Sequence, residues 1–316
     1  MSVEGFGVSQ DAVTLAVLGA GAWGTTLAEL ARRQGHVVRV WSRRGSASLE
    51  SAIAGVDLVV AAISMAGVRP VCQALQVAGL PAGAAIASAT KGLDAQSLQT
   101  PGQLWQAYFP ATSIVVLSGP NLSKEIEQGL PAAAVAASTD LAAASLVQRV
   151  FSSQQFRTYV NADPLGVELG GALKNVVAIA AGVCDGLQLG TNAKAALLTR
   201  ALPEIVRVGE TLGAQTPTFY GLSGLGDLLA TCGSPLSRNY QVGYRLAQGQ
   251  TLEQAIAAIT GTAEGVNTAR VLVQLAAQRG ITVPIATQVA RLLAGAISPS
   301  QAVQSLMERE LKAEFS

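Results

Sequence analysis

Lys174 and Asn175 stand side by side in an apolar, helix-like stretch that runs from residue 166 to residue 175 (GVELGGALKN). Burial disfavours the charged form of an amine, so such surroundings would lower the pKa of this lysine toward neutrality. A lysine of that kind can give a proton to an alkoxide as it forms, while the neighbouring amide orients a hydroxyl or carbonyl group. The pair points to carbonyl reduction, with Lys174 as proton donor. An interdomain salt bridge is the alternative role for Lys174.

One histidine, His36, competes with Lys174 for the role of general acid. It lies in the turn before the second predicted strand, at the edge of the predicted sheet opposite the cofactor crevice. We therefore expect a structural or surface role for it. Asp227 lies in the glycine-rich run GLSGLGDLL (residues 221–229), which delivers a single carboxylate. That carboxylate could hold Lys174 in place or bond a substrate hydroxyl.

Three consecutive polar residues have the side chains that a phosphate receptor needs. Ser237, Arg238 and Asn239 supply a hydroxyl, a guanidinium and an amide, and they follow Pro235 near the expected start of a helix. The N–H groups of a helix start attract anions, and a guanidinium can grip a phosphate through two hydrogen bonds. Glu264 is a further acidic residue flanked by glycines.

Gly19, Gly21 and Gly24 form a GxGxxG motif between the predicted strand Leu15–Leu18 and the predicted helix Ala22–Gln34. The first glycine of such a motif makes a tight turn, the second lets the backbone approach a pyrophosphate, and the third lets helix pack on strand. The phosphates would sit at the positive end of the helix. The motif predicts a dinucleotide site, and a tight turn without a ligand is the alternative.

Two arginines follow the second predicted strand, where the choice between NAD and NADP is made. An acidic residue about 20 positions after the motif would bond the ribose 2′-hydroxyl of NAD. Here the strand Val37–Trp41 is followed by Ser42, Arg43 and Arg44, without an acid. Two guanidinium groups suit a 2′-phosphate, so we expect NADP(H) or NAD(H) to bind, with NADP(H) favoured. Solvated loop charges are the alternative.

Two further loops follow predicted strands and should face the same crevice. Lys91 follows the strand Ala84–Ser88, and Gly119 and Asn121 follow the strand Ile114–Leu117. Ligands of open α/β sheets bind at the carboxyl ends of the strands, which is where these residues would lie. An ordinary solvated surface lysine is the alternative for Lys91.

The pattern of apolar runs predicts the fold that positions these residues. Short runs typical of doubly buried strands alternate with helix-like stretches, which predicts an α/β, Rossmann-like, doubly wound parallel sheet. The predicted strands are Leu15–Leu18, Val37–Trp41, Asp57–Ile63, Ala84–Ser88, Ile114–Leu117 and Ala132–Ala137, and the predicted helices among them include Ala22–Gln34 and Gln96–Tyr108.

From Leu165 onward the sequence predicts helices and no strand. We therefore expect an NAD(P)-binding domain over residues 1–162 and an all-helical substrate domain over residues 163–316, separated by the turn signal at 161–164. The predicted helices are Val176–Val183, Lys194–Leu212, Tyr240–Ala247, Thr251–Ile259 and Thr268–Gln278.

Composition narrows the class of protein. The chain has 316 residues, of which 50% are hydrophobic and 13% charged, with a net charge of +1. Such a chain builds a large core and lacks the basic field of a nucleic-acid binder. The apolar run Val176–Cys184 is about half of the ~20 residues that a membrane span needs. We expect no membrane span, no signal peptide in residues 1–13 and a cytoplasmic location. Three widely spaced cysteines without nearby histidines predict buried apolar residues and no metal site.

The motifs together resemble the bacterial-type NAD(P)-dependent glycerol-3-phosphate dehydrogenases. The likeness covers nearly the whole chain, and the combination of GGALKN, GLGDL and SRN is specific to that family. In the family's order, the matching segments are GAGAWGTTLA, ATKGL, SGPNLSKE, GVELGGALKNVVAIAAG, GLSGLGDLLATC and SRN. One departure is the shorter segment between the second and third strands, between Trp41 and Asp57.

The resemblance implies roles for individual residues. It makes Lys174 the catalytic proton donor and acceptor, with Asn175 and Asp227. The residues implied for glycerol 3-phosphate are Lys91, Gly119, Asn121, Lys174, Asp227, Ser237, Arg238 and Asn239. The residues implied for the cofactor, beside the three motif glycines, are Ala22, Trp23, Arg43, Arg44, Lys91, Ser123, Arg238, Thr262 and Glu264.

The predicted reaction is the reversible reduction of dihydroxyacetone phosphate to sn-glycerol 3-phosphate, and the resemblance implies that the product feeds glycerophospholipid synthesis. A reductase of the β-hydroxyacid or ketopantoate type is a rival, because it also joins a Rossmann domain to helices through an essential lysine. A non-catalytic NADP(H) sensor is a rival of another class, although it would need neither Lys174 nor Asp227. The sequence leaves the oligomeric state open, with a homodimer as one alternative.

Overall fold

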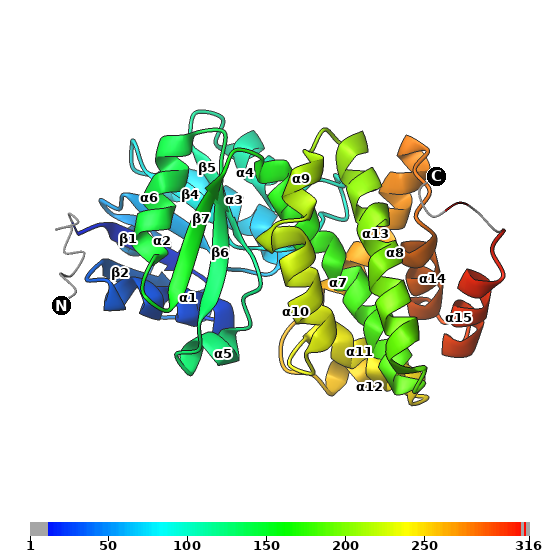
Figure 1. Cartoon of the computed structure of the whole chain (residues 1–316). Helices are drawn as coiled ribbons and strands as arrows, with labels where there is room; N and C mark the ends of the chain where they lie inside the picture. Colours follow the sequence, from blue (N-terminus) through cyan, green and yellow to red (C-terminus); the bar gives the residue numbers. More distant parts are fainter. Residues whose placement is uncertain (1–11, 311–312, 314–316) are drawn as a thin grey trace, which may run out of the picture.

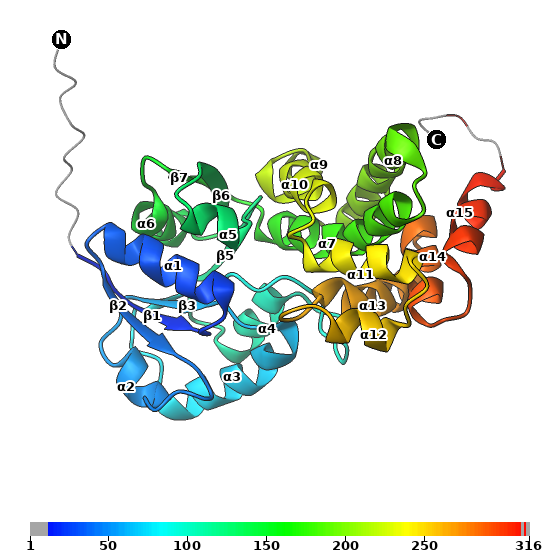
Figure 2. The same ribbon diagram turned by 90° about the horizontal axis from the view of Figure 1, so that it is seen from below.

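The computed structural model describes residues 12–310 and residue 313. Two lobes lie side by side in both views: a sheet with its helices forms one, and helices alone form the other (Figures 1 and 2). The sheet has seven strands in the order β2-β1-β3-β4-β5-β6-β7. This arrangement confirms the predicted fold class, a Rossmann-like sheet followed by helices. The strands are β1 Thr14–Leu18, β2 Val37–Trp41, β3 Leu58–Ala61, β4 Ala85–Ser88, β5 Ile114–Ser118, β6 Ala132–Ala137 and β7 Phe156–Asn161.

The first five strands are parallel, as predicted, but β6 pairs with β5 in the antiparallel sense. The reason lies in the connection. The only helix between β5 and β6, α5 (Ser123–Glu127), has five residues and spans ~7.5 Å at 1.5 Å per residue. It is too short to carry the chain back along the sheet, so the chain reverses at the carboxyl edge instead. Strand β7 then pairs parallel to β6.

Strand β7 was not among the predicted strands. Its residues alternate between buried and exposed, with Phe156 and Thr158 inside and Arg157 and Tyr159 outside. It lies at the edge of the sheet, where one face stays open, so it has no continuous apolar run. A search for doubly buried strands therefore passes over it.

Helices cover both faces of the sheet. One core joins β-strand side chains to α1, α5 and α6, and a second joins the opposite face to α2, α3 and α4. The chain therefore winds on both sides of the sheet, as a doubly wound fold requires. The helices of this lobe are α1 Ala22–Arg33, α2 Leu49–Ile53, α3 Met65–Ala78, α4 Pro101–Tyr108, α5 Ser123–Glu127 and α6 Leu141–Phe151.

The longest helix, α7 (Pro164–Gly186), connects the two lobes. Asp163 caps it: one carboxylate oxygen accepts the N–H of Gly166 at 2.9 Å, and the other accepts the hydroxyl of Thr218 at 2.8 Å. The sequence predicted a helix over residues 176–183 after a helix-like stretch at residues 166–175, although glycines lower helix propensity in the first turns. Tertiary packing overrides that propensity here, since other segments lie against those glycines.

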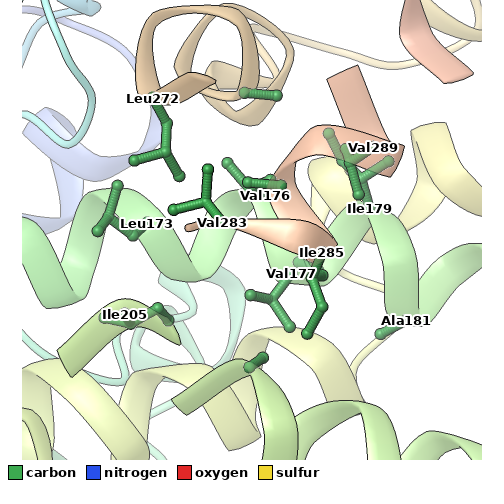
Figure 3. Close-up of a cluster of buried hydrophobic side chains, with 14 of the residues drawn as sticks. Leu173, Val176, Val177, Ile179, Ala181, Ile205, Leu272, Val283, Ile285 and Val289 are labelled. Carbon is green, nitrogen blue, oxygen red and sulfur yellow. The ribbon is translucent and has the colours of Figure 1, made fainter. Parts of the chain in front are cut away.

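Helix α7 belongs to two cores. Near its start, Val167 packs with Val116 and Val135 of the sheet. Farther along, Leu173 and Val176 enter the large core of the helical lobe (Figure 3). The predicted boundary at residues 162/163 falls beside the α7 cap, yet the first turns of α7 still lie on the sheet. The division into two domains at that point stays a prediction.

Helix α7 is also long and apolar enough, by length and composition alone, to cross a membrane. Its most apolar 18-residue window has a mean hydropathy of 1.5, but 94% of that window is buried inside the protein. A lipid-facing helix would present those side chains outward. We conclude that α7 is the central helix of a protein core.

Glycines let α7 and α11 (Arg238–Ala247) pack backbone to backbone. A Cβ on Gly182 would collide with the carbonyl oxygen of Tyr240, and a Cβ on Gly243 with that of Ile179. The end of α7 is thereby held against the start of α11. Besides α7 and α11, the helices after residue 186 are α8 Gly190–Thr211, α9 Thr216–Phe219, the π-helix η1 Leu222–Gly226, α10 Asp227–Gly233, α12 Leu252–Ala257, α13 Glu264–Arg279, α14 Pro284–Leu293 and α15 Pro299–Met307.

A buried carboxylate fixes α14, which was not among the predicted helices. Glu204 of α8 is 6% exposed, and its two oxygens accept the N–H groups of Ile285 and Ala286, each at 2.9 Å. These donors belong to the first turn of α14, where backbone N–H groups have no partner within the helix. The side chain of Glu204 therefore caps a helix that is distant in sequence.

We expect Glu204→Ala to lower the free energy of unfolding by about 2–5 kcal/mol, because two buried N–H groups lose their acceptors. Glu204→Gln keeps one acceptor oxygen and should cost less. Glu29→Ala removes an exposed glutamate that pairs with Arg33 at 2.9 Å, and it should change stability by less than ~1 kcal/mol. Urea unfolding of the three variants measures this, and equal losses for Glu204→Ala and Glu29→Ala would contradict the capping role.

Candidate active site

The glycine motif makes a tight turn that leaves the start of α1 open. Gly19 has a φ of 119°, and a Cβ there would collide with the carbonyl oxygen of Ala62. A Cβ on Gly24 would collide with the carbonyl oxygen of Gly19. Gly21 differs, because nothing lies within 4 Å of its Cβ position and no side chain caps α1 there. The first turn of α1 thus offers backbone N–H groups to an approaching phosphate.

The end of β2 lies beside this turn. The N–H of Gly19 donates to the carbonyl oxygen of Trp41 at 2.8 Å. Arg43 and Arg44 follow in an exposed turn, so both guanidinium groups stand at the same edge of the sheet as the glycines. Ala22 is exposed and Trp23 partly buried in the first turn of α1. The structure therefore brings the predicted cofactor residues of this lobe together, and their chemistry fits a phosphorylated dinucleotide.

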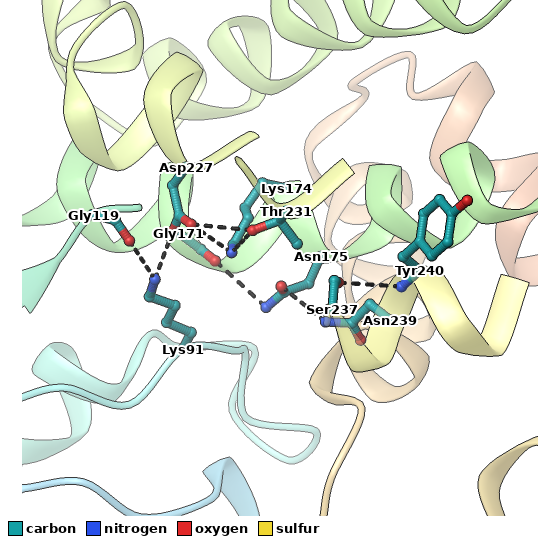
Figure 4. A network of polar contacts seen from close by, with 10 residues as sticks. All are labelled: Lys91, Gly119, Gly171, Lys174, Asn175, Asp227, Thr231, Ser237, Asn239 and Tyr240. Atoms are coloured by element: carbon teal, nitrogen blue, oxygen red, sulfur yellow. Dashed lines mark hydrogen bonds and ion pairs between the residues drawn. The ribbon is translucent and has the colours of Figure 1, made fainter. Parts of the chain in front are cut away.

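Lys174 forms the centre of a second cluster, on the helical lobe (Figure 4). The side chain is 6% exposed, and its Nζ lies 2.7 Å from Oδ1 of Asp227. It also donates to the hydroxyl of Thr231, which lies one turn after Asp227 on α10. The π-helix η1 ends directly before Asp227. A π-turn shifts the face of the helix that follows it, and this one leads into the residue that holds the lysine.

Lys91 reaches the same carboxylate from the sheet lobe. Its Nζ lies 2.5 Å from Oδ2 of Asp227 and donates to the carbonyl oxygen of Gly119 at 3.1 Å. One carboxylate thus joins two lysines that come from the loop after β4 and from α7. The predicted neighbours Lys91, Gly119, Lys174 and Asp227 do meet, although Asp227 is shared between both amines.

The surroundings of Lys174 lower its pKa. Burial is the largest cause; the negative charge of Asp227 raises the pKa and the positive charge of Lys91 lowers it, and the resulting pKa is about 8. The cationic form therefore loses and regains its proton within the physiological range. Such an amine can act as an acid or a base near neutral pH.

Asn175 belongs to a chain of amides that joins three helices. Its side-chain oxygen accepts from the amide of Asn239 at 2.9 Å, and the oxygen of Asn239 accepts the N–H of Gly265 at 2.8 Å. Ser237 is the N-cap of α11 and accepts the N–H of Tyr240 at 3.3 Å. The side chains of Ser237 and Asn239 therefore have structural partners, beside any role toward a ligand.

Arg238 and Glu264 lie where the helical lobe meets the sheet. Arg238 is exposed, and a Cβ on Gly261 would lie 2.6 Å from its guanidinium. The carboxylate of Glu264 accepts the N–H of Met65, at the start of α3, at 3.2 Å. Burial raises the pKa of Glu264, and the charge of Arg238 opposes that shift. Thr262 lies exposed between these residues in sequence.

Other polar residues of the sheet lobe lie farther from Lys174 or serve the backbone. The amide of Asn121 is satisfied by the carbonyl oxygens of Ala133 at 3.1 Å and Pro120 at 3.3 Å. Ser123 is the first residue of α5 and is partly buried. His36 accepts the N–H of Val13, just before β1, so it lies at the amino edge of the sheet. Burial lowers the pKa of His36.

Sequence reasoning missed Thr231. Its hydroxyl accepts from Lys174 and donates to Asp227 at 3.1 Å, so it closes the polar cluster. A signal was present: Thr231 follows Asp227 by four residues, and residues so spaced lie on the same face of a helix. The glycine-rich run before Asp227 hid the helix that makes this spacing meaningful.

Two family models and several relatives match this chain. The sequence model of the NAD-dependent glycerol-3-phosphate dehydrogenase N-terminus matches residues 14–47 and 44–144, and that of its C-terminus matches residues 163–304. Glycerol-3-phosphate dehydrogenase [NAD(P)+] of Trichormus variabilis is 61% identical over 302 residues, covering 96% of this chain and 98% of its own. Its counterpart from a Synechocystis species is 60% identical over 299 residues, covering 95% and 94%.

A solved structure of the same family matches this chain. The crystal structure of glycerol-3-phosphate dehydrogenase from Coxiella burnetii superposes with a TM-score of 0.91 at 34% identity. The superposition covers 94% of this chain and 99% of that one. Sequence and structure therefore match along both lobes.

The charge of Asp227 should be measurable in the titration of Lys174. We expect Asp227→Asn to lower the pKa of Lys174 below about 8, because burial and Lys91 then act without an opposing negative charge. Asp185→Asn is the control, since Asp185 pairs with Lys194 at 2.6 Å. The chain has five lysines, so NMR titration of the lysine ε-groups can resolve them. An unchanged or higher pKa in Asp227→Asn would refute this electrostatic account.

Proposed function

The chain belongs to the NAD-dependent glycerol-3-phosphate dehydrogenase family, and from that premise we propose how its own residues carry out the reaction. It catalyses the reversible reduction of dihydroxyacetone phosphate to sn-glycerol 3-phosphate with NAD(P)H. The observation that supports the mechanism best is the buried amine of Lys174, held by Asp227 where the two lobes meet.

The cofactor, when bound, supplies a hydride to the ketone carbon. Gly19, Gly21 and Gly24 would hold its pyrophosphate against the start of α1, since the Cβ space at Gly21 is open. Arg43 and Arg44 would grip a 2′-phosphate, which favours NADP(H) over NAD(H). The other residues that we assign to the cofactor wall are Ala22, Trp23, Lys91, Ser123, Arg238, Thr262 and Glu264.

Lys174 would move the proton. With a pKa of about 8 its amine is largely protonated at neutral pH, so Nζ can donate to the carbonyl oxygen as the alkoxide forms. Asp227 and Thr231 fix the position of Nζ. In the oxidative direction the neutral amine would accept the proton from the substrate hydroxyl. Asn175, with its amide held by Asn239, would orient the reacting oxygen.

The substrate phosphate would bind at the start of α11. Arg238 is exposed there, while Ser237 and Asn239 hold the helix start in place through their own hydrogen bonds. Binding the phosphate at a distance from the carbonyl orients the reacting carbon, which is how remote contacts accelerate a reaction. Lys91, Gly119 and Asn121 would close the substrate site from the sheet lobe.

We further propose that residues 1–162 and 163–316 act as the cofactor and substrate domains, that the enzyme works in the cytoplasm and that its product feeds glycerophospholipid synthesis. A homodimer is the assembly we would test first. Sedimentation velocity would distinguish a dimer from a monomer directly.

Lys174→Met should lower kcat by roughly 10²–10⁴-fold, the usual contribution of one proton-transfer group. Lys194→Met removes a lysine that pairs with Asp185 and should leave kcat nearly unchanged. In the wild type, the reductive kcat should fall as the pH rises through about 8, because only the protonated amine donates. NADPH oxidation with dihydroxyacetone phosphate measures both effects.

Non-phosphorylated 2-keto acids in the same assay test the rival reductase. Their turnover at a comparable rate would favour the ketopantoate-type reaction, and NADPH binding without any turnover would favour a sensor. A near-wild-type rate in Lys174→Met would remove its assigned role.

The double variant Arg43→Glu with Arg44→Glu should lower the preference for NADPH over NADH at least ~10-fold, because a hydrogen bond to a charged group contributes about 1.5–3 kcal/mol. Arg279→Glu with Arg291→Glu is the matched control, because it reverses two exposed charges on helices of the other lobe. The ratio of kcat/KM for the two cofactors measures the preference. A ratio equal to that of the wild type would show that Arg43 and Arg44 are solvated loop charges.

A further inference from the structure

Glu168 is a buried carboxyl group to which the mechanism assigns no role. It is 6% exposed and lies on α7, six residues before Lys174. Its Oε1 accepts the N–H of Gly102 at 2.6 Å. Gly102 belongs to the first turn of α4, on the sheet lobe. The contact therefore ties the helix that carries Lys174 to an element of the other lobe.

The start of α4 is shaped to receive this carboxyl group. A Cβ on Gly102 would lie 2.8 Å from Oε2 of Glu168 and 3.0 Å from its Cδ, so a larger residue there would displace the carboxyl group from the start of α4. Thr100 caps α4, and its hydroxyl lowers the pKa of Glu168. The positive end of the helix and the N–H of Gly102 thus face one buried acceptor. Burial raises the pKa of Glu168 to about 7.

The segment before α4 carries Lys91. It is held on both sides: Asp94 pairs with Arg69 at 2.6 Å, and the carbonyl oxygen of Leu93 accepts from Asn267 of α13 at 3.0 Å. These two anchors and the α4 start together fix the loop that follows Lys91. Lys91 is the residue of that loop that reaches Asp227.

These contacts close a ring. Along α7, Glu168 and Lys174 are ~9 Å apart at 1.5 Å per residue. From Glu168 the ring passes to Gly102, back along the loop to Lys91 and then to Asp227, which returns it to Lys174. A helix is stiff over this length, so the contact at one end of the ring bears on the geometry at the other.

We propose that Glu168 is a positioning residue that, through the start of α4, holds Lys91 at the place where it shares Asp227 with Lys174. The inference rests on the proposed function of Lys91, Lys174 and Asp227. A merely structural role would lower stability alone. A positioning role also changes the substrate contact of Lys91 and the electrostatic surroundings of Lys174.

The direction in which the pKa of Lys174 would change follows from the groups that face it, namely Asp227, Lys91, Cys232 and Thr231. The charge of Lys91 lowers the pKa of Lys174, and Asp227 raises it. If Lys91 moves away, its lowering effect on the pKa of Lys174 weakens, and the raising effect of Asp227 acts more fully. The pKa of Lys174 then rises, and the decline of the reductive kcat moves to higher pH.

The test compares Glu168→Ala with Glu204→Ala. Glu204 is the matched control, because it is also a buried side-chain carboxyl group at the first turn of another helix: it accepts two N–H groups of α14 in the helical lobe, and Glu168 accepts one of α4. Both variants should lose stability in urea. Only Glu168→Ala should raise KM for dihydroxyacetone phosphate, by ~10-fold or more, as expected for one lost contact to a charged group. Only Glu168→Ala should also move the decline of the reductive kcat to higher pH.

Glu168→Gln keeps an acceptor for Gly102 and should restore KM to within ~3-fold of the wild type. If Glu168→Ala does not fold, Gly102→Ala decides by the same two readouts, since its Cβ would displace the Glu168 carboxyl group from the start of α4. The proposal would be overturned if the kinetics of Glu168→Ala matched those of Glu204→Ala. If Glu168→Ala does not fold, the kinetics of Gly102→Ala take its place in this comparison.

Failure of the proposed function would look different. In that case Lys174→Met would keep its rate, or Lys91→Met would leave KM for dihydroxyacetone phosphate unchanged. The inference alone fails if both lysine variants behave as proposed while Glu168→Ala differs from the wild type only in stability. The two failures are therefore distinguishable in one set of assays.

Discussion

The paired ion contacts of the Asp227 carboxylate are the interaction on which the arrangement of both lobes depends. The carboxylate bonds Lys91 from the sheet lobe and Lys174 from α7, at 2.5 and 2.7 Å. A buried charge is costly unless it is paired, and here one negative charge serves two positive ones. The imbalance, together with burial, keeps the pKa of Lys174 at about 8. The same contact thus joins the two lobes and sets the electrostatic surroundings of the amine that we propose as the proton donor.

Helix α7 makes that contact possible because it is buried along its whole length. Its first turns lie on the sheet through Val167, and its later turns form the centre of the helical core. Glycines at 170 and 171 let the backbone of η1 and the side chain of Ser118 approach the helix closely. A side chain at residue 170 would collide with the backbone of η1, and one at residue 171 with the hydroxyl of Ser118. The low helix propensity of these glycines is offset by packing on every side.

Polar side chains at the junction have structural partners beside the roles that we propose for them. Asn239 holds Asn175 and the start of α13, and Ser237 caps the helix that presents Arg238. Because these groups are fixed before any ligand arrives, little reorganisation is needed at the moment of reaction. A reactive group held by rigid neighbours is more accurately placed than one on a free loop.

The sequence by itself determined the fold class, the strand positions β1 to β6 and the residue types of the site, because doubly buried strands, GxGxxG and GGALKN leave local patterns. It could not show that β6 runs antiparallel or that β7 exists, since those depend on the length of α5 and on an open sheet edge. Only the tertiary structure decided that Asp227 joins two lysines, that Thr231 closes the cluster and that Glu168 meets α4. Such contacts join residues 53 to 136 positions apart or require a helix that glycines conceal, so no local pattern encodes them.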